Sequence, residues 1–264
     1  MRFFEQLARR SREIDSLVCV GLDPDFDKHR VEDVAAFNRA IIEATAPYAA
    51  CYKPNIAFYE QFGIPGLRAL EATLTAIPSG IPIIGDVKRG DIGNTAEAYA
   101  RAMFEQWDFG AVTVSGYQGR DTVEPFLAYE GRGVFVLCRT SNPGSREFQE
   151  QRLANGRMLF EEVALTASAW SPNIGLVVGA TAPNELRKVR SLVPETPILI
   201  PGVGTQGGRP DEVVAAAGYL PGKMVVNASR GVMYATEGPG FAEAAAEAAR
   251  LLRDQLKAAA AAHA

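Results

Sequence analysis

Three ionisable residues stand close together at the end of one short apolar run. Asp86, Lys88 and Asp91 follow residues 81–85, which read Ile-Pro-Ile-Ile-Gly. Such a run predicts a buried parallel strand, and residues two apart on a strand point to the same face. Asp86 and Lys88 should therefore share a face, with Asp91 in the loop that follows. Because buried charge is costly unless it is paired or used, the three groups form either an ion-pair network or a reactive site.

Charged residues also lie in or next to the two preceding apolar runs. Asp23 comes after residues 17–22, and Lys53 lies within the run 51–58. A structural ion-pair network remains an alternative, but five charges from three consecutive strands at one mouth favour a catalytic site. A Mg²⁺ site is a further alternative, because carboxylates suit that ion. The interleaved lysines argue against it, since their ammonium groups would occupy the cation positions, so we expect no metal.

Two glycine-containing loops predict a phosphate site. Pro201 is followed by Gly-Val-Gly-Thr-Gln-Gly-Gly over residues 202–208, and residues 229–231 read Ser-Arg-Gly. Glycines let backbone N–H groups approach an anion closely, and the guanidinium of Arg230 would add a bidentate clamp. Plain tight turns are the alternative interpretation. In barrels, however, the loops after strands seven and eight commonly bind phosphate.

Short apolar runs alternate with helix-like segments along the chain. The runs cover residues 17–22, 51–58, 82–87, 111–114, 134–138, 174–178, 198–200 and 224–226; the helix-like segments include 31–46, 95–107, 158–170, 184–192, 211–217 and 241–256. Eight such units in about 250 residues predict an α/β fold, a (β/α)8 TIM barrel, with function at the C-terminal ends of the strands. An open doubly wound sheet is the runner-up. Against it, Gly-Leu-Asp-Pro-Asp at 21–25 stands where a Gly-x-Gly-x-x-Gly turn is expected.

Composition narrows the class of protein. The chain has 264 residues, 47% of them hydrophobic, and a net charge of −4. We expect a single domain over 1–264 that ends in an Ala-rich helix with a fraying tail. The absence of a basic stripe argues against nucleic acid, and no apolar run approaches the roughly 18 residues of a membrane span. Residues 1–6 do not read as a signal peptide, so we expect a cytoplasmic protein.

The charged set and the loops resemble the orotidine 5′-phosphate decarboxylase family, in its longer bacterial branch. The family signature Asp-x-Lys-x-x-Asp-Ile-x-x-Thr is matched by Asp86, Lys88, Asp91, Ile92 and Thr95. The resemblance covers essentially the whole chain and includes the segments 21–23, 52–55, 140–144, 201–208 and 227–231.

The resemblance implies the reaction and its catalytic residues. The expected activity is cofactor-free decarboxylation of orotidine 5′-phosphate to uridine 5′-phosphate, the last step of de novo pyrimidine biosynthesis. Lys88 would protonate C6 as carbon dioxide leaves, and Asp86 would lie against the departing carboxylate. Lys53 and Asp91 would complete an alternating array of lysines and aspartates. The resemblance also implies a homodimer, in which Asp91 and Thr95 reach into the neighbouring subunit's site.

The same resemblance implies how the nucleotide is held. Asp23 and Lys53 would bind ribose hydroxyls, and Ser141 would read the pyrimidine edge. The predicted contacts with the base and the phosphate are completed by Pro201, Gln206, Gly207 and Arg230.

Two other functions stay open at this stage. A Mg²⁺-dependent sugar-phosphate aldolase or decarboxylase of the same superfamily would share the Asp-x-Lys-x-x-Asp pattern. It would lack the Ile-Gly-Asn-Thr continuation at 92–95, the Ser141 loop and Gln206. A barrel that binds nucleotide without turnover would be expected to lose part of the charged set, which is complete here.

Overall fold

The strands form one parallel sheet. The structure is a computed structural model, and it describes residues 1–25, 27–204 and 207–263. Within these residues the eight strands are ordered β2-β1-β8-β7-β6-β5-β4-β3. Their bounds are β1 Val18–Gly21, β2 Cys51–Lys53, β3 Ile84–Arg89, β4 Ala111–Val114, β5 Gly133–Arg139, β6 Ile174–Val178, β7 Ile198–Pro201 and β8 Met224–Ala228.

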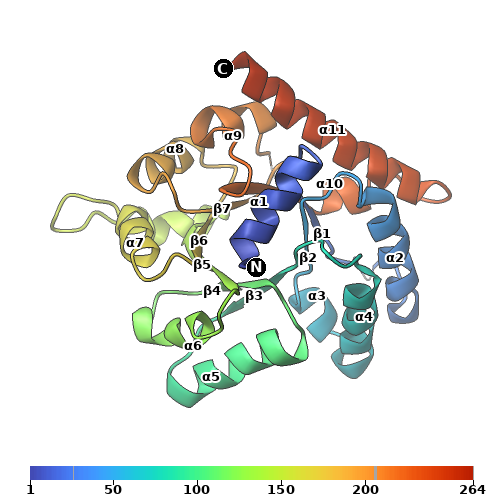
Figure 1. Cartoon of the computed structure of the whole chain (residues 1–264), viewed down its shortest axis with the longest axis horizontal. Helices are drawn as coiled ribbons and strands as arrows, with labels where there is room; N and C mark the ends of the chain where they lie inside the picture. Colours follow the sequence, from blue (N-terminus) through green and yellow to red (C-terminus); the bar gives the residue numbers. More distant parts are fainter. Residues whose placement is uncertain (26, 205–206, 264) are drawn as a thin grey trace.

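Helices connect successive strands and surround the sheet (Figure 1). The α-helices are α1 Phe3–Glu13, α2 Val34–Thr45, α3 Ala57–Glu60, α4 Gly63–Ala76, α5 Gly93–Arg101, α6 Glu124–Leu127, α7 Leu159–Ser168, α8 Pro183–Leu192, α9 Pro210–Ala217, α10 Arg230–Met233 and α11 Phe241–Ala262. Short 3-10 turns are η1 Val31–Asp33, η3 Arg120–Thr122 and η4 Pro143–Glu147, and a π-helical turn, η2, covers Ala102–Gln106.

Backbone hydrogen bonds close the sheet between its two outermost strands. The N–H of Tyr52 donates to the carbonyl of Pro82, and the N–H of Asp86 donates to the carbonyl of Pro54, each at 3.0 Å. The sheet is therefore a barrel, which confirms the predicted (β/α)8 fold and rules out the open doubly wound sheet.

Helix α1 covers the N-terminal end of the barrel and lies across the centre of the ring of strands in Figure 1. Its Phe3 and Leu7 are buried and pack with inward-facing residues of the strands, among them Cys19, Ile84 and Phe135. Because apolar side chains fill this end, the polar residues at the opposite end are left to form the site.

Two elements differ from the sequence-based expectation. Strand β2 ends at Lys53 instead of continuing to residue 58, because the chain turns into α3, where Tyr59 is buried and donates its hydroxyl to the carbonyl of Leu22 at 2.8 Å. Helix α11 continues to Ala262, beyond the expected end of the helix at residue 256. Leu256 and Ala259 are buried there, so tertiary packing holds the final turns.

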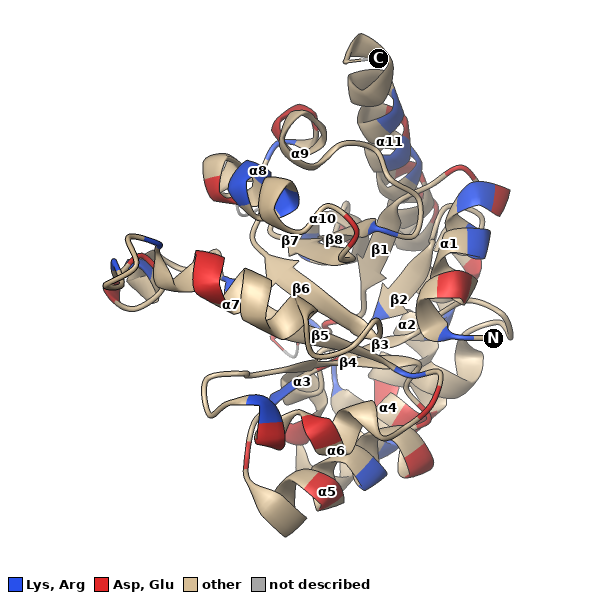
Figure 2. Cartoon of the chain, turned by 60° about the vertical axis from the view of Figure 1, so that its left-hand side comes forward, with Lys and Arg blue, Asp and Glu red and all other residues tan. Residues whose placement is uncertain are grey.

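Charged residues lie mainly on the helices and loops in Figure 2, where α5 and α11 carry both signs. Among the helices that the structure describes, none combines the length and apolar character needed to cross a membrane.

Candidate active site

A cavity of about 730 Å³ opens at the C-terminal ends of the strands. Its lining comes from all eight strands or the loops that follow them. The lining residues are Asp23, Asp25, Lys53, Asn55, Phe58, Asp86, Lys88, Thr113, Leu137, Thr140, Ser141, Asn142, Val177, Leu199, Pro201, Gly202, Val203, Asn227, Ser229 and Arg230. The predicted gathering of polar residues at this end of the barrel is thus present.

Asp86 is at the centre of a charged array on the wall of this cavity. Its Oδ2 lies 2.7 Å from Nζ of Lys53, and its Oδ1 lies 2.5 Å from Nζ of Lys88. The side chains of Lys53 and Asp86 are 4% and 11% exposed, whereas that of Lys88 is 46% exposed. The buried carboxylate of Asp86, itself paired with Lys53, therefore holds the Lys88 ammonium at the opening where a ligand would meet it.

Ionic contacts fix the charge state of the buried pair. Burial alone would raise the pKa of Asp86, but Lys53 and Lys88 outweigh it and hold that pKa well below its ordinary value. Burial likewise opposes the charged form of Lys53, but the carboxylates of Asp86 and Asp23 raise its pKa above the ordinary value. Both groups are therefore ionised at neutral pH.

Asp23 is held in place from two sides. Its Oδ1 accepts a hydrogen bond from the N–H of Asn55 at 3.0 Å, and its Oδ2 accepts one from the hydroxyl of Ser229. These contacts connect the ends of β1, β2 and β8, so Asp23, Lys53 and Asp86 form a continuous charged wall.

The predicted phosphate end is only partly within the described residues. Arg230 and Pro201 line the cavity, and Arg230 is exposed. Gly207, with a φ of +94°, follows in the loop but is not part of the lining. Gln206 lies outside the residues that the structure describes.

Ser141 also lines the cavity, in the loop after β5. Arg139, which is buried at the end of β5, anchors this loop. Its guanidinium lies 2.6 Å from Oε1 of Glu150 and donates to the hydroxyl of Ser145 at 2.5 Å. The N–H of Thr140 donates to Oε1 of Gln149 at 2.8 Å. The long connection is therefore tied to the barrel close to Ser141.

Two predicted site residues lie outside the cavity lining. Asp91 is in the loop after β3, where its Oδ1 accepts a hydrogen bond from the N–H of Ile92 at 2.8 Å. Thr95 is exposed in the first turn of α5. In one copy of the chain, neither side chain joins the contacts around Asp86.

The structure adds cavity residues that sequence analysis missed. Thr113 lines the cavity from β4, and Asn227 does so from β8; both are buried. A polar residue inside an otherwise apolar strand run was the available signal for Thr113. The apolar part of the lining comes from Leu137, Val177 and Leu199, which are ordinary strand residues in the sequence.

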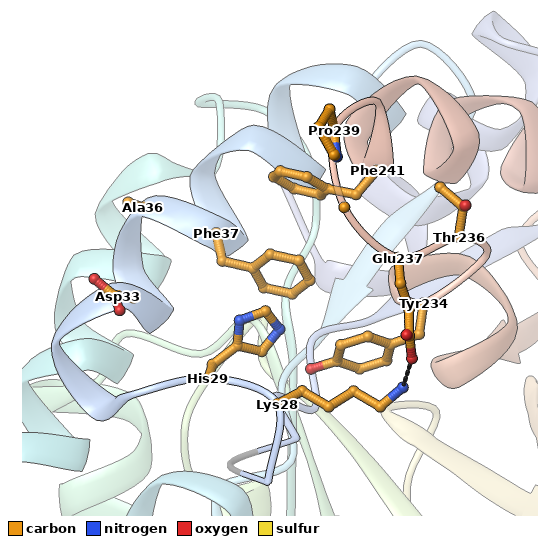
Figure 3. Close-up of a pocket in the computed structure, with 11 residues that line it drawn as sticks. Lys28, His29, Asp33, Ala36, Phe37, Tyr234, Thr236, Glu237, Pro239 and Phe241 are labelled. Carbon is orange, nitrogen blue, oxygen red and sulfur yellow. Dashed lines mark hydrogen bonds and ion pairs between the residues drawn. The ribbon is translucent and has the colours of Figure 1, made fainter.

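A second cavity of about 710 Å³ lies beside α2 and the segment before α11. Figure 3 shows the rings of His29, Phe37, Tyr234 and Phe241 arranged around it. The centroids of Phe37 and Phe241 are 5.0 Å apart, and the Lys28 ammonium lies 2.6 Å from Oε1 of Glu237. Because these four rings are the largest part of its wall, we call it the aromatic cavity, and we call the one around Asp86 the charged cavity.

Donor atoms for a metal are not grouped in either region. In residues 1–25, 27–204 and 207–263 there is no cluster of three or more His, Cys, Asp or Glu side chains that could hold an ion. Around Asp86, the lysine ammonium groups already occupy both carboxylate oxygens.

The chain is similar to known proteins over nearly its full length. It is 48% identical over 263 residues to the orotidine 5′-phosphate decarboxylase of Dehalococcoides mccartyi (strain BAV1), covering 97% of each chain. It is 47% identical to the protein of the same name from Herpetosiphon aurantiacus, covering 95% of each.

Solved structures agree with these relatives. The Leishmania donovani UMP synthase structure matches with a TM-score of 0.90 and 41% identity, over 98% of this chain and 56% of that one. The putative orotidine-monophosphate decarboxylase of Toxoplasma gondii matches with a TM-score of 0.89 and 36% identity, over 100% and 99%. A family model, "Orotidine 5′-phosphate decarboxylase / HUMPS family", matches residues 16–247. The chain therefore belongs to the orotidine 5′-phosphate decarboxylase / HUMPS family.

Proposed function

We propose that this chain is a carboxy-lyase that converts orotidine 5′-phosphate to uridine 5′-phosphate and carbon dioxide, the last step of de novo pyrimidine biosynthesis, in the cavity around Asp86. The observation that carries the proposal is the pairing of one buried carboxylate with two lysines, one of them partly exposed at the cavity. This arrangement supplies fixed positive charge and a transferable proton at one point, within the family to which the chain belongs.

The difficulty of the reaction is the carbanion that it leaves. Breaking the bond between C6 and the carboxylate leaves its electron pair on an sp² carbon, in the plane of the ring, where the π system cannot delocalise it. Many decarboxylases borrow an electron sink from a cofactor. We propose that here the ammonium of Lys88 stabilises this electron pair and then gives it a proton, so that C6 ends with hydrogen in place of the carboxylate.

Asp86 contributes by charge and by position. Its Oδ1 holds Nζ of Lys88 at 2.5 Å and so directs the ammonium into the cavity. A substrate carboxylate beside Asp86 is repelled, and this repulsion disappears as neutral carbon dioxide forms. Two unit charges ~4 Å apart interact by roughly 4 kcal/mol at an effective dielectric constant of about 20. Repulsion therefore lowers only part of the barrier, and binding of the distant phosphate contributes the rest by holding the substrate against the array.

The remaining predicted residues bind the nucleotide in this proposal. Asp23 and Lys53 bind the ribose hydroxyls from the charged wall. Ser141 contacts the pyrimidine edge, and Arg230 holds the phosphate; both residues line the cavity. Pro201, Gln206 and Gly207 belong to the loop next to the phosphate. All of these contacts would be made by one domain formed by the whole barrel.

Asp91 and Thr95 act in a second copy of the chain in this proposal. Neither lines the cavity of its own copy. The apolar side chain of Ile92, next to Asp91 in sequence, is exposed. Tyr117 is also exposed, in the loop after β4, which passes close to Gly90. Such exposed apolar residues support a contact between copies. The homodimer would then complete each site with residues from its partner.

A mixing experiment tests the shared site. Lys88→Ala and Asp91→Ala are each expected to be inactive, but dimers containing one copy of each would have one intact site. After mixing and re-equilibration of equal amounts, random pairing predicts about a quarter of the wild-type activity. No recovery of activity in demonstrated mixed dimers would contradict the assignment of Asp91 to the partner's site.

One assay separates this function from that of a metal-dependent relative. Orotidine 5′-phosphate is supplied to the purified chain, and release of carbon dioxide is measured with and without EDTA. We expect turnover that the chelator does not change, because the charges around Asp86 come from lysines. Failure to release carbon dioxide would refute the proposal, and inhibition by EDTA that Mg²⁺ reverses would show the cofactor-free mechanism to be wrong.

A further inference from the structure

Strand β3 is irregular where it carries the two central charged residues. Gly85 pairs with Val112 and Arg89 pairs with Val114, so residues 86–88 lie opposite Thr113 alone. Lys88 has a φ of +45°, a left-handed conformation that a non-glycine residue adopts rarely. The backbone N–H groups of this bulge therefore have no regular place in the ladder between β3 and β4.

The hydroxyl of Thr113 accepts the hydrogen bonds that the ladder does not provide for these N–H groups. Its Oγ1 accepts hydrogen bonds from the N–H of Val87 and the N–H of Lys88, each at 3.0 Å. The same oxygen donates to Oδ1 of Asp86 at 3.0 Å. One buried side chain thus contacts the backbone of Lys88 and the carboxylate that holds the Lys88 ammonium.

All the hydrogen-bonding positions of this hydroxyl are occupied, so its orientation is fixed. A threonine hydroxyl has one proton to donate and two lone pairs to accept with. The two N–H groups occupy the lone pairs, so the proton must point to Asp86. Oδ1 of Asp86 accepts hydrogen bonds from this hydroxyl and from the ammonium of Lys88, so the carboxylate is held from two directions.

We infer that Thr113 is a positioning residue. Its hydroxyl sets the relative placement of Asp86 and Lys88 by binding the backbone of the bulge and the Asp86 carboxylate together. The inference rests on the proposed decarboxylase function. It assigns to Thr113 no contact with the reacting carbon. Its effect is on how accurately the Lys88 ammonium is aimed, and hence on the chemical step more than on binding.

The test compares two substitutions that differ in the hydroxyl. Thr113→Val keeps the shape of the side chain but removes the hydroxyl, and Thr113→Ser keeps the hydroxyl but removes the methyl group. We expect Thr113→Val to lower kcat by about 100-fold, a loss that a displacement of about 1 Å can cause. Its dissociation constant for uridine 5′-phosphate should change by less than about threefold, because the nucleotide contacts remain. Thr113→Ser should stay close to the wild type in kcat.

Thr45 provides a matched control for a merely structural effect. It is also a buried threonine, and its hydroxyl donates to the carbonyl of Ile41 at 2.7 Å, but it lies on α2 outside the cavity lining. Thr45→Val should lower the melting temperature without lowering the kcat of the folded protein. Equal kcat losses in Thr113→Val and Thr113→Ser, or a Thr113→Val kcat within about threefold of wild type, would overturn the inference.

Hydrogen exchange tests the geometry even if Thr113→Val does not fold. In the wild-type protein the amides of Val87 and Lys88 should exchange slowly, because both donate to a buried oxygen. Exchange at the rate of unprotected loop amides would overturn the inference. Wild-type turnover of orotidine 5′-phosphate is measured in parallel, so a failure of the proposed function is seen separately from a failure of the Thr113 contacts.

Discussion

Two cavities among the described residues, one around Asp86 and one beside α2, have nearly equal volumes but different walls. Each contains a lysine paired with a carboxylate, at 2.5 Å for Lys88 and Asp86 and at 2.6 Å for Lys28 and Glu237. Asp86 is 11% exposed and has a second lysine on its other oxygen, whereas Glu237 is 80% exposed. The same pair of groups is therefore fixed in one cavity and exposed to solvent in the other.

This difference shows why volume alone does not identify an active site. An exposed ion pair is screened by water and contributes little energy, whereas a buried one keeps its charges at fixed positions. Fixed charges stabilise a developing negative charge without having to reorganise. The stacked rings around Phe37 supply apolar surface but no such array. Chemistry is accordingly expected in the cavity around Asp86.

Replacing Lys88 in one cavity and Lys28 in the other should give the largest difference in kcat between matched substitutions. Lys88→Ala should lower kcat by at least about 10⁴-fold, because both the proton donor and the nearest positive charge are lost. The fold should survive, since the side chain is half-exposed and Lys53 still pairs with Asp86. Steady-state assays with orotidine 5′-phosphate measure the effect.

Lys28→Ala is the matched control for this substitution. Its ion pair with Glu237 is exposed, so kcat should stay within about twofold of the wild type. A Lys88→Ala enzyme with a near-native rate would show that Lys88 is not the proton donor.

Removing each carboxylate charge should change stability unequally. Asp86→Asn leaves the ammonium of Lys53 buried with a neutral partner, and the free energy of unfolding should fall by about 3–5 kcal/mol at pH 7. Glu237→Gln should change it by less than about 1 kcal/mol, because that pair is exposed. Urea denaturation at one protein concentration measures both differences. Similar values for the two substitutions would show that burial does not distinguish the two pairs.

The pH dependence follows from the direction of the Asp86 pKa shift. This pKa is lower in the folded protein than the value of about 3.9 for an unfolded aspartate. The stabilisation from ionised Asp86 is therefore complete well above pH 4 and is lost as the pH falls from there toward the folded-state pKa. The difference in unfolding free energy between the wild type and Asp86→Asn should narrow over that acidic range. A difference that is independent of pH would contradict the lowered pKa.

The sequence was sufficient to predict the barrel and the residues at its charged mouth. Eight apolar runs that alternate with helix-like segments favour a barrel, because each run must be buried in a parallel sheet. Asp23, Lys53, Asp86 and Lys88 lie within those runs or directly after them. The bulge at Lys88 was not predictable in the same way. It depends on a hydroxyl in another strand, Thr113, and periodicity within one strand carries no information about its neighbour.

The second cavity was beyond sequence reasoning for a related reason. Its rings come from the segment near His29, from α2 and from the segment around Tyr234, which meet only after the barrel closes. The proposed role of Asp91 in a neighbouring copy is a different case, because the contacts of one chain do not test it. The contacts of Thr113 with β3 and the ring contacts of the second cavity join segments that are distant in sequence, and local sequence patterns do not predict such contacts.

Removing one guanidinium at the cavity should weaken phosphate binding specifically. Arg230→Ala should raise the dissociation constant for uridine 5′-phosphate by roughly 10- to 150-fold, the equivalent of about 1.5–3 kcal/mol for hydrogen bonds to a charged group. Binding of uridine, which has no phosphate, should change little. Isothermal titration calorimetry with both ligands measures the difference.

Arg209→Ala controls for a general loss of positive charge. Arg209 is exposed, lies outside the cavity lining and pairs with Asp211 at 2.6 Å. Arg209→Ala should leave the affinities for uridine 5′-phosphate and for uridine unchanged. Equal losses for nucleotide and nucleoside in Arg230→Ala would show that Arg230 does not contact phosphate.

The smallest expected effect concerns a hydrogen bond between a residue of one cavity and a residue of the other. The hydroxyl of Tyr234, whose ring faces the aromatic cavity in Figure 3, accepts a hydrogen bond at 2.6 Å from the N–H of Asp25, which lines the charged cavity. Tyr234→Phe keeps the ring against Phe37 but leaves this N–H without its acceptor. The loss of one hydrogen bond, about 1 kcal/mol, should raise KM for orotidine 5′-phosphate by about fivefold at most and leave kcat unchanged.

Phe37→Leu changes the same stack without touching Asp25, and it should lower stability while leaving KM unchanged. If Phe37→Leu raised KM as much as Tyr234→Phe, the aromatic packing as a whole would support the charged cavity. The two regions would then be coupled through the side-chain stack, and the single hydrogen bond to Asp25 would not account for the connection between them.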